Sequence, residues 1–93
     1  MNERDWRWKH LETQPYLRDV KFKRAVYTEY RVGWDHDHCV GCWAKFAEQD
    51  GPEILHEGYT TTDEYPKGAK YEWVCPDCFS DFKTDMNWIE IRT

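Results

Sequence analysis

The chain has 93 residues, a formal net charge of −5, 33% charged residues and an aromatic content of 17%. This length predicts one small domain, and the composition is that of a globular rather than a disordered protein. No stretch approaches the roughly 18 apolar residues of a membrane-spanning helix, so no membrane association is expected. We predict a single domain over residues 1–93, with an aromatic and charged N-terminal arm (1–19) and a folded part (20–93).

Charge is distributed unevenly along the chain. Residues 1–32 hold eight Lys or Arg against five Asp or Glu, whereas residues 33–93 hold five against thirteen. Because nucleic-acid binding requires neutralised phosphates, the acidic part argues against a general nucleic-acid binder, and it suits a basic protein partner. The N-terminus, MNERDWRWKHLETQ, lacks the apolar region of a signal peptide, so a cytoplasmic protein with reduced thiols is expected.

The first third of the chain predicts a short helix and a strand. Residues 6–12 (WRWKHLE) are expected to form a helical turn or an aromatic arm, which ends before Pro15. Apolar and polar residues then alternate from Val20 to Val32, which predicts a long half-buried strand. Its apolar face, interrupted by Arg24, would carry Val20, Phe22, Val26, Thr28, Tyr30 and Val32. Its other face would carry Lys21, Lys23, Glu29 and Arg31, joined by Ala25 and Tyr27.

The remaining elements are expected after residue 42. WAKFAEQ (43–49) is interpreted as a helical turn or an irregular return, and residues 54–62 and 69–75 as the two strands of a hairpin. A type I turn is predicted between those strands at 65–68 (YPKG), which has Pro at its second position and Gly at its fourth. WIEIRT (88–93) is expected to add an edge strand.

A C-terminal helix is predicted between the hairpin and that edge strand. Pro76 suits the first position of a helix, and Asp77 is favourable in the first turn. Phe79, Phe82 and Met86 have the spacing of one helical face, so the helix is expected to run to about Asn87. With few aliphatic residues in the chain, the core is expected to consist largely of aromatic rings.

Four cysteines in two Cys-x-x-Cys pairs are the strongest chemical signal. We predict that Cys39, Cys42, Cys75 and Cys78 bind one Zn²⁺, because tetrahedral zinc takes four thiolates and two intervening residues let a tight turn aim both sulfurs at one ion. Gly41 is expected to supply an unusual φ within the first pair. The alternatives are redox chemistry or disulfides, although a thioredoxin-like motif would need a βαβ context that is absent here.

The layout of a Cys-x-x-Cys knuckle, a hairpin and a helix carrying the last two cysteines resembles a treble-clef or related zinc-ribbon domain over about residues 36–87. The pattern HCxxCWxKF…GYxT…WxCxxCFxDF is also similar to small uncharacterised bacterial proteins, a resemblance that implies a fold and no activity. The expected fold class is therefore α+β: a small zinc-stabilised domain of antiparallel strands with a knuckle and a C-terminal helix.

Asp35-His36-Asp37-His38 precedes the first cysteine pair and resembles the Asp-His-Asp-His stretch of the recombination-endonuclease branch of HNH nucleases. That resemblance implies a catalytic metal ion and a histidine general base. In that branch, however, the stretch lies between the two cysteine pairs, and no histidine follows Cys78 here. His36 has a workable spacing to Cys39 for metal binding, whereas the favoured interpretation is a polar loop whose histidines, including His38, support the knuckle through hydrogen bonds.

The expected function is that of a non-enzymatic zinc protein that binds another protein, such as an adaptor or immunity-like module. Four thiolates would saturate the ion and leave no open position for catalysis. The alternatives are a nucleic-acid-binding protein, which would use the basic cluster of the predicted strand, and an HNH-like nuclease. The basic cluster of the predicted strand consists of Lys21, Lys23, Arg24 and Arg31. The isolated His10 and His56 are interpreted as structural.

Overall fold

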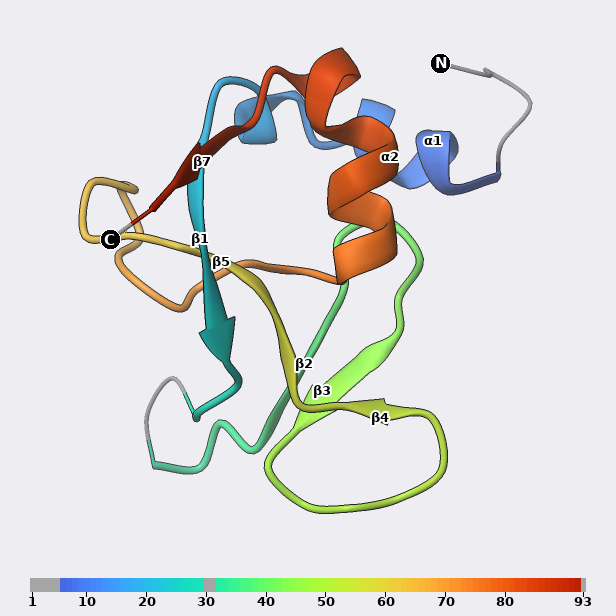
Figure 1. Cartoon of the computed structure of the whole chain (residues 1–93), viewed down its shortest axis with the longest axis vertical. Helices are drawn as coiled ribbons and strands as arrows, with labels where there is room; N and C mark the ends of the chain where they lie inside the picture. The colour runs from blue at the N-terminus through green and yellow to red at the C-terminus, as the bar shows by residue number, and fades with distance from the viewer. Residues whose placement is uncertain (1–5, 30–31, 93) are drawn as a thin grey trace.

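A computed structural model describes residues 6–29 and 32–92 and shows two helices, a 3₁₀ turn and seven short strands (Figure 1). The helices are α1 (Trp6–Glu12) and α2 (Pro76–Met86), and the 3₁₀ turn η1 spans Pro15–Leu17. The strands are β1 (Lys21–Val26), β2 (His36–His38), β3 (Lys45–Ala47), β4 (Ile54–Leu55), β5 (Glu57–Thr61), β6 (Trp73–Val74) and β7 (Ile89–Ile91). The α+β class is confirmed, whereas the division into an arm and a folded part stays a prediction.

The strands form two small sheets of mixed direction. One sheet has the order β6-β5-β1-β7 and the other the order β2-β3-β4. The expectation of antiparallel strands is wrong for two pairs, since β1–β7 and β3–β4 are parallel. Two parallel strands need a connection that runs back along the sheet between them. The segment before β7 contains α2, and the loop 48–53 joins β3 to β4. The edge position predicted for the last strand is confirmed.

The predicted hairpin and its turn are present with shorter strands. β5 pairs antiparallel with β6, with Tyr59 opposite Val74 and Thr60 opposite Trp73. The Gly68 amide donates to the Tyr65 carbonyl at 2.8 Å, the hydrogen bond that closes a β-turn at 65–68. The second strand begins at residue 73 rather than 69, because the Thr61 hydroxyl and carbonyl hold residues 68–72 in an irregular loop.

The predicted strand from Val20 to Val32 is much shorter than expected. β1 ends at Val26, which is 64% exposed instead of buried on the apolar face. The side chain that points into the core is instead that of Tyr27. Its ring packs against Phe46 and Trp73, and its hydroxyl donates to Asp37. A chain that leaves the sheet no longer alternates between its two faces, which explains the error. Tyr30 and Arg31 lie outside the described residues.

The core is built largely from aromatic rings, as the composition predicts. The rings of Phe22, Phe79 and Trp88 contact one another where α2 covers the larger sheet. The helix has the predicted bounds, with Phe79, Phe82 and Met86 buried, and its C-terminal cap is Asn87 in the left-handed conformation. This packing fixes the first turn of α2, which carries Cys78, beside the loop between β2 and β3, which carries Cys39 and Cys42 (Figure 1).

Candidate metal centre

The four cysteines come from two segments that the fold brings together. Cys39 follows β2 and forms a bridge with Trp73 of β6, and Cys42 precedes β3. Cys75 is the N-terminal cap of α2, and Cys78 lies in its first turn. All four sulfur atoms lie within 4.8 Å of one another. The two Cys-x-x-Cys pairs, which are separated by 32 residues, therefore form one cluster, as the sequence predicts.

The spacing of the sulfurs fits a tetrahedral ion and not a disulfide. The Sγ atoms of Cys42 and Cys75 are 3.6 Å apart, and all four cysteines are free. Four Zn–S bonds of about 2.3 Å would separate the sulfurs by about 3.8 Å, whereas a disulfide requires about 2.05 Å. A tetrahedral set of four soft thiolates is typical of zinc sites and of iron–sulfur sites. The residues present thus fit a four-cysteine zinc site, and Cys39, Cys42, Cys75 and Cys78 would hold the ion.

Backbone amides support negative charge on two of the sulfurs. The Gly41 and Cys75 amides donate to Cys39 Sγ at 3.4 and 3.3 Å. The Cys78 amide donates to Cys75 Sγ at 3.4 Å, so this sulfur caps the N-terminus of α2. Hydrogen bonds from amides and the positive end of a helix both favour the thiolate over the thiol. These groups lower the charge density that an ion with four thiolate ligands would carry.

Proton sharing within the cluster separates the pKa values of its thiols. Hydrogen bonding to Cys39 lowers the pKa of Cys42 to about 6 and, together with hydrogen bonding to Cys78, that of Cys75 to about 2. The same hydrogen bonds, first that with Cys42, raise the pKa of Cys39. The cluster therefore already favours thiolates at Cys42 and Cys75, the chemical form that a metal ion requires.

The unusual backbone conformation predicted at Gly41 occurs at Trp43 instead. Gly41 does not adopt a positive φ, so that expectation is wrong; a Cβ at this position would instead lie 3.0 Å from Cys78 Sγ. The glycine thus leaves room for the close approach of the two segments. Trp43 has the positive φ, at 66°. A side chain in the left-handed region costs about 1–2 kcal/mol, so Trp43 occupies a strained position.

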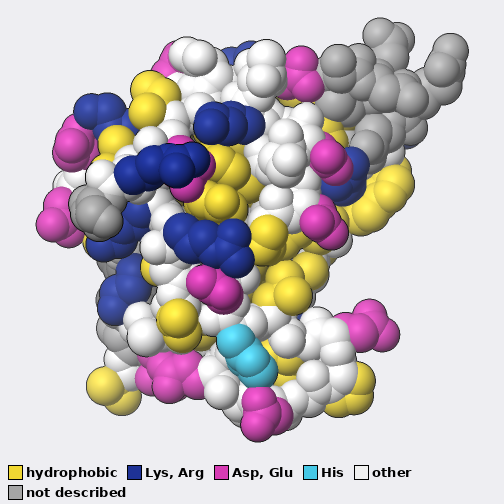
Figure 2. Space-filling model, in the orientation of Figure 1, with side chains coloured by type: hydrophobic (Ala, Val, Ile, Leu, Met, Phe, Trp, Pro, Cys, Tyr) yellow, Lys and Arg dark blue, Asp and Glu magenta, His cyan; other side chains and the backbone are white. Residues whose placement is uncertain are grey.

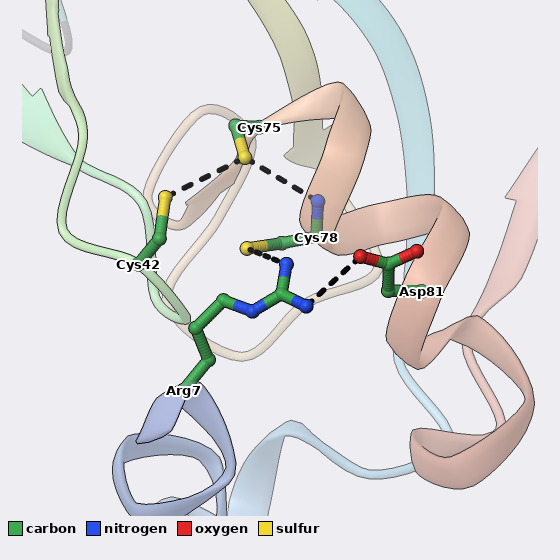
Figure 3. A network of polar contacts seen from close by, with 5 residues as sticks. All are labelled: Arg7, Cys42, Cys75, Cys78 and Asp81. Carbon is green, nitrogen blue, oxygen red and sulfur yellow. Dashed lines mark hydrogen bonds and ion pairs between the residues drawn. The ribbon is translucent and has the colours of Figure 1, made fainter. Parts of the chain in front are cut away.

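Helix α1 contacts the cysteine cluster through side chains that the sequence analysis did not identify. Arg7 Nη1 donates to Cys78 Sγ at 3.6 Å, and its Nη2 forms an ion pair with Asp81 at 2.9 Å. Figure 3 shows the guanidinium between these two residues of α2. His10 Nδ1 lies 2.7 Å from the Gly41 carbonyl, and Gln14 Nε2 donates to the Val40 carbonyl at 3.1 Å. The spacing of residues 7 and 10, which is that of one helical face, was the available signal for the first two; Gln14 lies beyond the end of α1.

The Asp-His-Asp-His stretch lies on β2 and outside the cluster. His36 Nδ1 lies 2.7 Å from Asp35 Oδ1, and the His38 ring contacts the rings of His36 and Trp43. Asp37 Oδ2 instead accepts hydrogen bonds from Tyr27 and Trp34. Within residues 6–29 and 32–92, the cysteines form the one group of three or more potential ligands close enough to share an ion. The imidazole that contacts the knuckle backbone is that of His10.

Two of the four residues of the basic cluster, Lys21 and Arg24, are paired with acidic neighbours. Lys21 forms an ion pair with Glu64 at 2.8 Å, and Arg24 forms one with Glu57 at 3.2 Å. Figure 2 shows Lys and Arg side chains interspersed with Asp and Glu on the face in view. Arg31 lies outside the described residues. Paired cations have less charge to offer a phosphate backbone, so the structure gives no support to a nucleic-acid surface here.

Comparison with protein-family models, with curated proteins and with solved structures found no match. The interpretation of the cluster therefore depends on the geometry of this chain alone. In the described part of the chain, neither helix has the length and apolar character needed to cross a membrane.

Proposed function

We propose that the protein is a zinc-binding domain of the treble-clef type, in which the four-cysteine site is structural, and that it acts as a protein-interaction module. The observation that carries the metal assignment is the convergence of four free thiols within 4.8 Å from two distant segments. A site of four thiolates saturates tetrahedral zinc, so the proposal assigns the ion no catalytic step. Free thiols persist in a reducing compartment, which suits the cytoplasm.

The arrangement of elements supports the treble-clef assignment. β2 and β3 pair antiparallel around the first cysteine pair, with Asp37 opposite Phe46. The β5–β6 hairpin follows, and α2 supplies the second pair from its N-terminal cap and first turn. This is the order of a knuckle, a hairpin and a ligand-bearing helix that the sequence suggests.

A structural role for zinc follows from where the site lies. Cys39, Cys75 and Cys78 are buried and belong to the same hydrophobic cluster as Phe79 and Trp73. Without an ion, mutual repulsion of the clustered thiolates would weaken the contact between the knuckle and α2. Metal binding in such domains contributes a large share of the folding free energy, about 10–16 kcal/mol in zinc-finger peptides.

The interaction role is supported by two large aromatic rings that remain exposed. Trp6 and Trp43 are 57% and 58% exposed. Tryptophan is enriched where proteins bind other proteins, since it covers a large area at a low cost in conformational entropy. The acidic balance of residues 33–93 adds an electrostatic preference for a basic partner.

Metal removal tests the structural role. We expect a strong zinc chelator to abolish the near-ultraviolet circular dichroism of the buried rings, and one equivalent of Zn²⁺ to restore it. Cys42→Ser should lose stoichiometric zinc, whereas His36→Ala, which alters an exposed residue outside the cluster, should retain it. A metal-free chain with an unchanged spectrum would refute the structural role.

A further inference from the structure

Five aromatic side chains form a continuous row on the surface beside the knuckle. The ring centroids are 5.7 Å apart for Trp6–His10, 5.6 Å for His10–Trp43, 5.8 Å for Trp43–His38 and 5.2 Å for His38–His36. The row, which we call the ring row, thus joins α1 to β2 through Trp43. Two elements that are distant in the sequence combine their rings here, and the buried core does not require either exposed tryptophan.

The backbone at Trp43 indicates that its ring serves a purpose on this surface. Trp43 is exposed and holds a left-handed conformation that glycine would adopt without strain. Strained residues that persist in a fold tend to be found at functional sites. An exposed tryptophan gains little from burial, so its stability contribution does not account for its presence at a position that favours glycine.

A groove of about 330 Å³ adjoins the ring row and has an acidic lining. His10, His38 and Trp43 contribute rings to it, and Asp37 and Glu72 contribute carboxylates. None of the described residues that line this groove is Lys or Arg. The groove therefore combines aromatic faces with two carboxylates and no lining Lys or Arg among the described residues, and aromatic faces and carboxylates both attract a cation.

The two carboxylates are partly buried, and their hydrogen-bond donors are neutral. Asp37 accepts hydrogen bonds from Tyr27 and Trp34, and Glu72 accepts one from the Tyr65 hydroxyl. Within the described part of the chain, neither forms an ion pair with Lys or Arg. Lys67 lies close enough to act on the charge of Glu72 but does not line the groove. A cation from outside the chain would therefore meet no Lys or Arg among the described residues that line it.

We propose that this groove docks a basic segment of a partner protein, with an Arg or Lys side chain against Trp43 and its charge facing Asp37 and Glu72. The proposal rests on the interaction role proposed above and names the class of its partner. Single-stranded nucleic acid also stacks on aromatic rings. The same carboxylates would repel its phosphates, so the groove chemistry favours the basic peptide.

The test uses the zinc-loaded full chain labelled with ¹⁵N and a synthetic Arg-Gly repeat heptapeptide as the probe. We expect the peptide to shift the Trp43 indole N–H resonance and the neighbouring knuckle amides, and added salt to weaken the binding. A Glu-Gly heptapeptide and an oligothymidylate of matched length should leave them unchanged. Binding of the oligothymidylate at the ring row, or absence of any shift with the Arg-Gly peptide, would overturn the proposal.

Variants separate the groove from the rest of the fold. Trp43→Gly removes the ring and suits the left-handed backbone, so it should keep stoichiometric zinc while weakening peptide binding at least tenfold. Glu72→Gln should weaken it severalfold. Ile89→Ala is the control, since Ile89 is exposed on β7 at the sheet edge opposite β6. Unchanged affinity in Trp43→Gly would refute the groove.

The failure of the groove can be distinguished from the failure of the broader function. A natural partner that binds Trp43→Gly and the unaltered protein equally would refute the groove as its docking site and would leave the interaction role standing. Loss of that partner in Trp43→Gly, with zinc and near-ultraviolet circular dichroism retained, supports the groove.

Discussion

Replacement of Arg7 by Met should weaken both the fold and the metal site, although Arg7 is not a ligand. The guanidinium donates to Cys78 Sγ, pairs with Asp81 and lies 4.6 Å from the centre of the Phe82 ring. Its side chain is only 18% exposed. Methionine keeps the apolar stem that packs on Phe82, so the substitution removes chiefly the charge and its hydrogen bonds.

The magnitude follows from these three contacts. Asp81 is 53% exposed, so its ion pair with Arg7 contributes about 0.5–1 kcal/mol after screening by solvent. The hydrogen bond to sulfur and the contact with the Phe82 ring contribute about 1 kcal/mol each at partly buried positions. A loss of about 2.5–3 kcal/mol would lower the Tm of a domain of this size by about 10–24 °C. Loss of a group that supports a metal ligand typically lowers metal affinity about 10- to 100-fold.

Thermal unfolding and zinc competition with a chromophoric chelator measure the two effects. Lys9→Ala is the matched control, because it removes one positive charge from an exposed position of the same helix. We expect this control to melt and to bind zinc like the unaltered protein. If Arg7→Met and Lys9→Ala behave alike in both assays, the guanidinium is not coupled to the cluster, and the account of α1 is wrong.

Two further substitutions test the packing and the electrostatics of the site. Gly41→Ala places a Cβ about 3.0 Å from Cys78 Sγ, so the zinc affinity of this variant should fall at least tenfold. Chelator competition measures the affinity. An affinity equal to that of the unaltered protein would show that the knuckle backbone can move away from Cys78 at no cost to metal binding. Burial raises the pKa of Glu72, so its stabilising contribution is fully present below its unfolded pKa of about 4.3 and is lost as the pH rises through the folded value. Glu72→Gln should therefore gain stability relative to the unaltered protein as the pH rises from 5 to 7 in urea unfolding, and a constant difference would contradict this sign.

Local signals in the sequence predict the parts of the fold that short-range physics determines. The C-terminal helix has a proline at its start, buried residues at helical spacing and an Asn cap, and each of these acts within one or two turns. The turn at 65–68 is likewise specified by four consecutive residues. The cysteine pairs belong to the same class, since metal geometry constrains their spacing.

Long-range pairing overrides local preference elsewhere. WAKFAEQ contains several helix-forming residues and predicts a helical turn or an irregular return, yet Lys45–Ala47 forms β3. β3 pairs with β2 across the knuckle and with β4 beyond a loop. The residues of β3 alone carry no signal for either pairing. The contacts of α1 were missed for a similar reason. Arg7 and His10 appear as ordinary polar residues until the helix lies against the knuckle.

X-ray absorption at the zinc edge of the purified full-length protein tests the central claim most directly. The account predicts one zinc per chain with four sulfur neighbours at about 2.3 Å. Nitrogen or oxygen neighbours would show that a residue outside Cys39, Cys42, Cys75 and Cys78 binds the ion. A protein that holds no stoichiometric zinc, with these four thiols free and the fold intact, would contradict the claim outright.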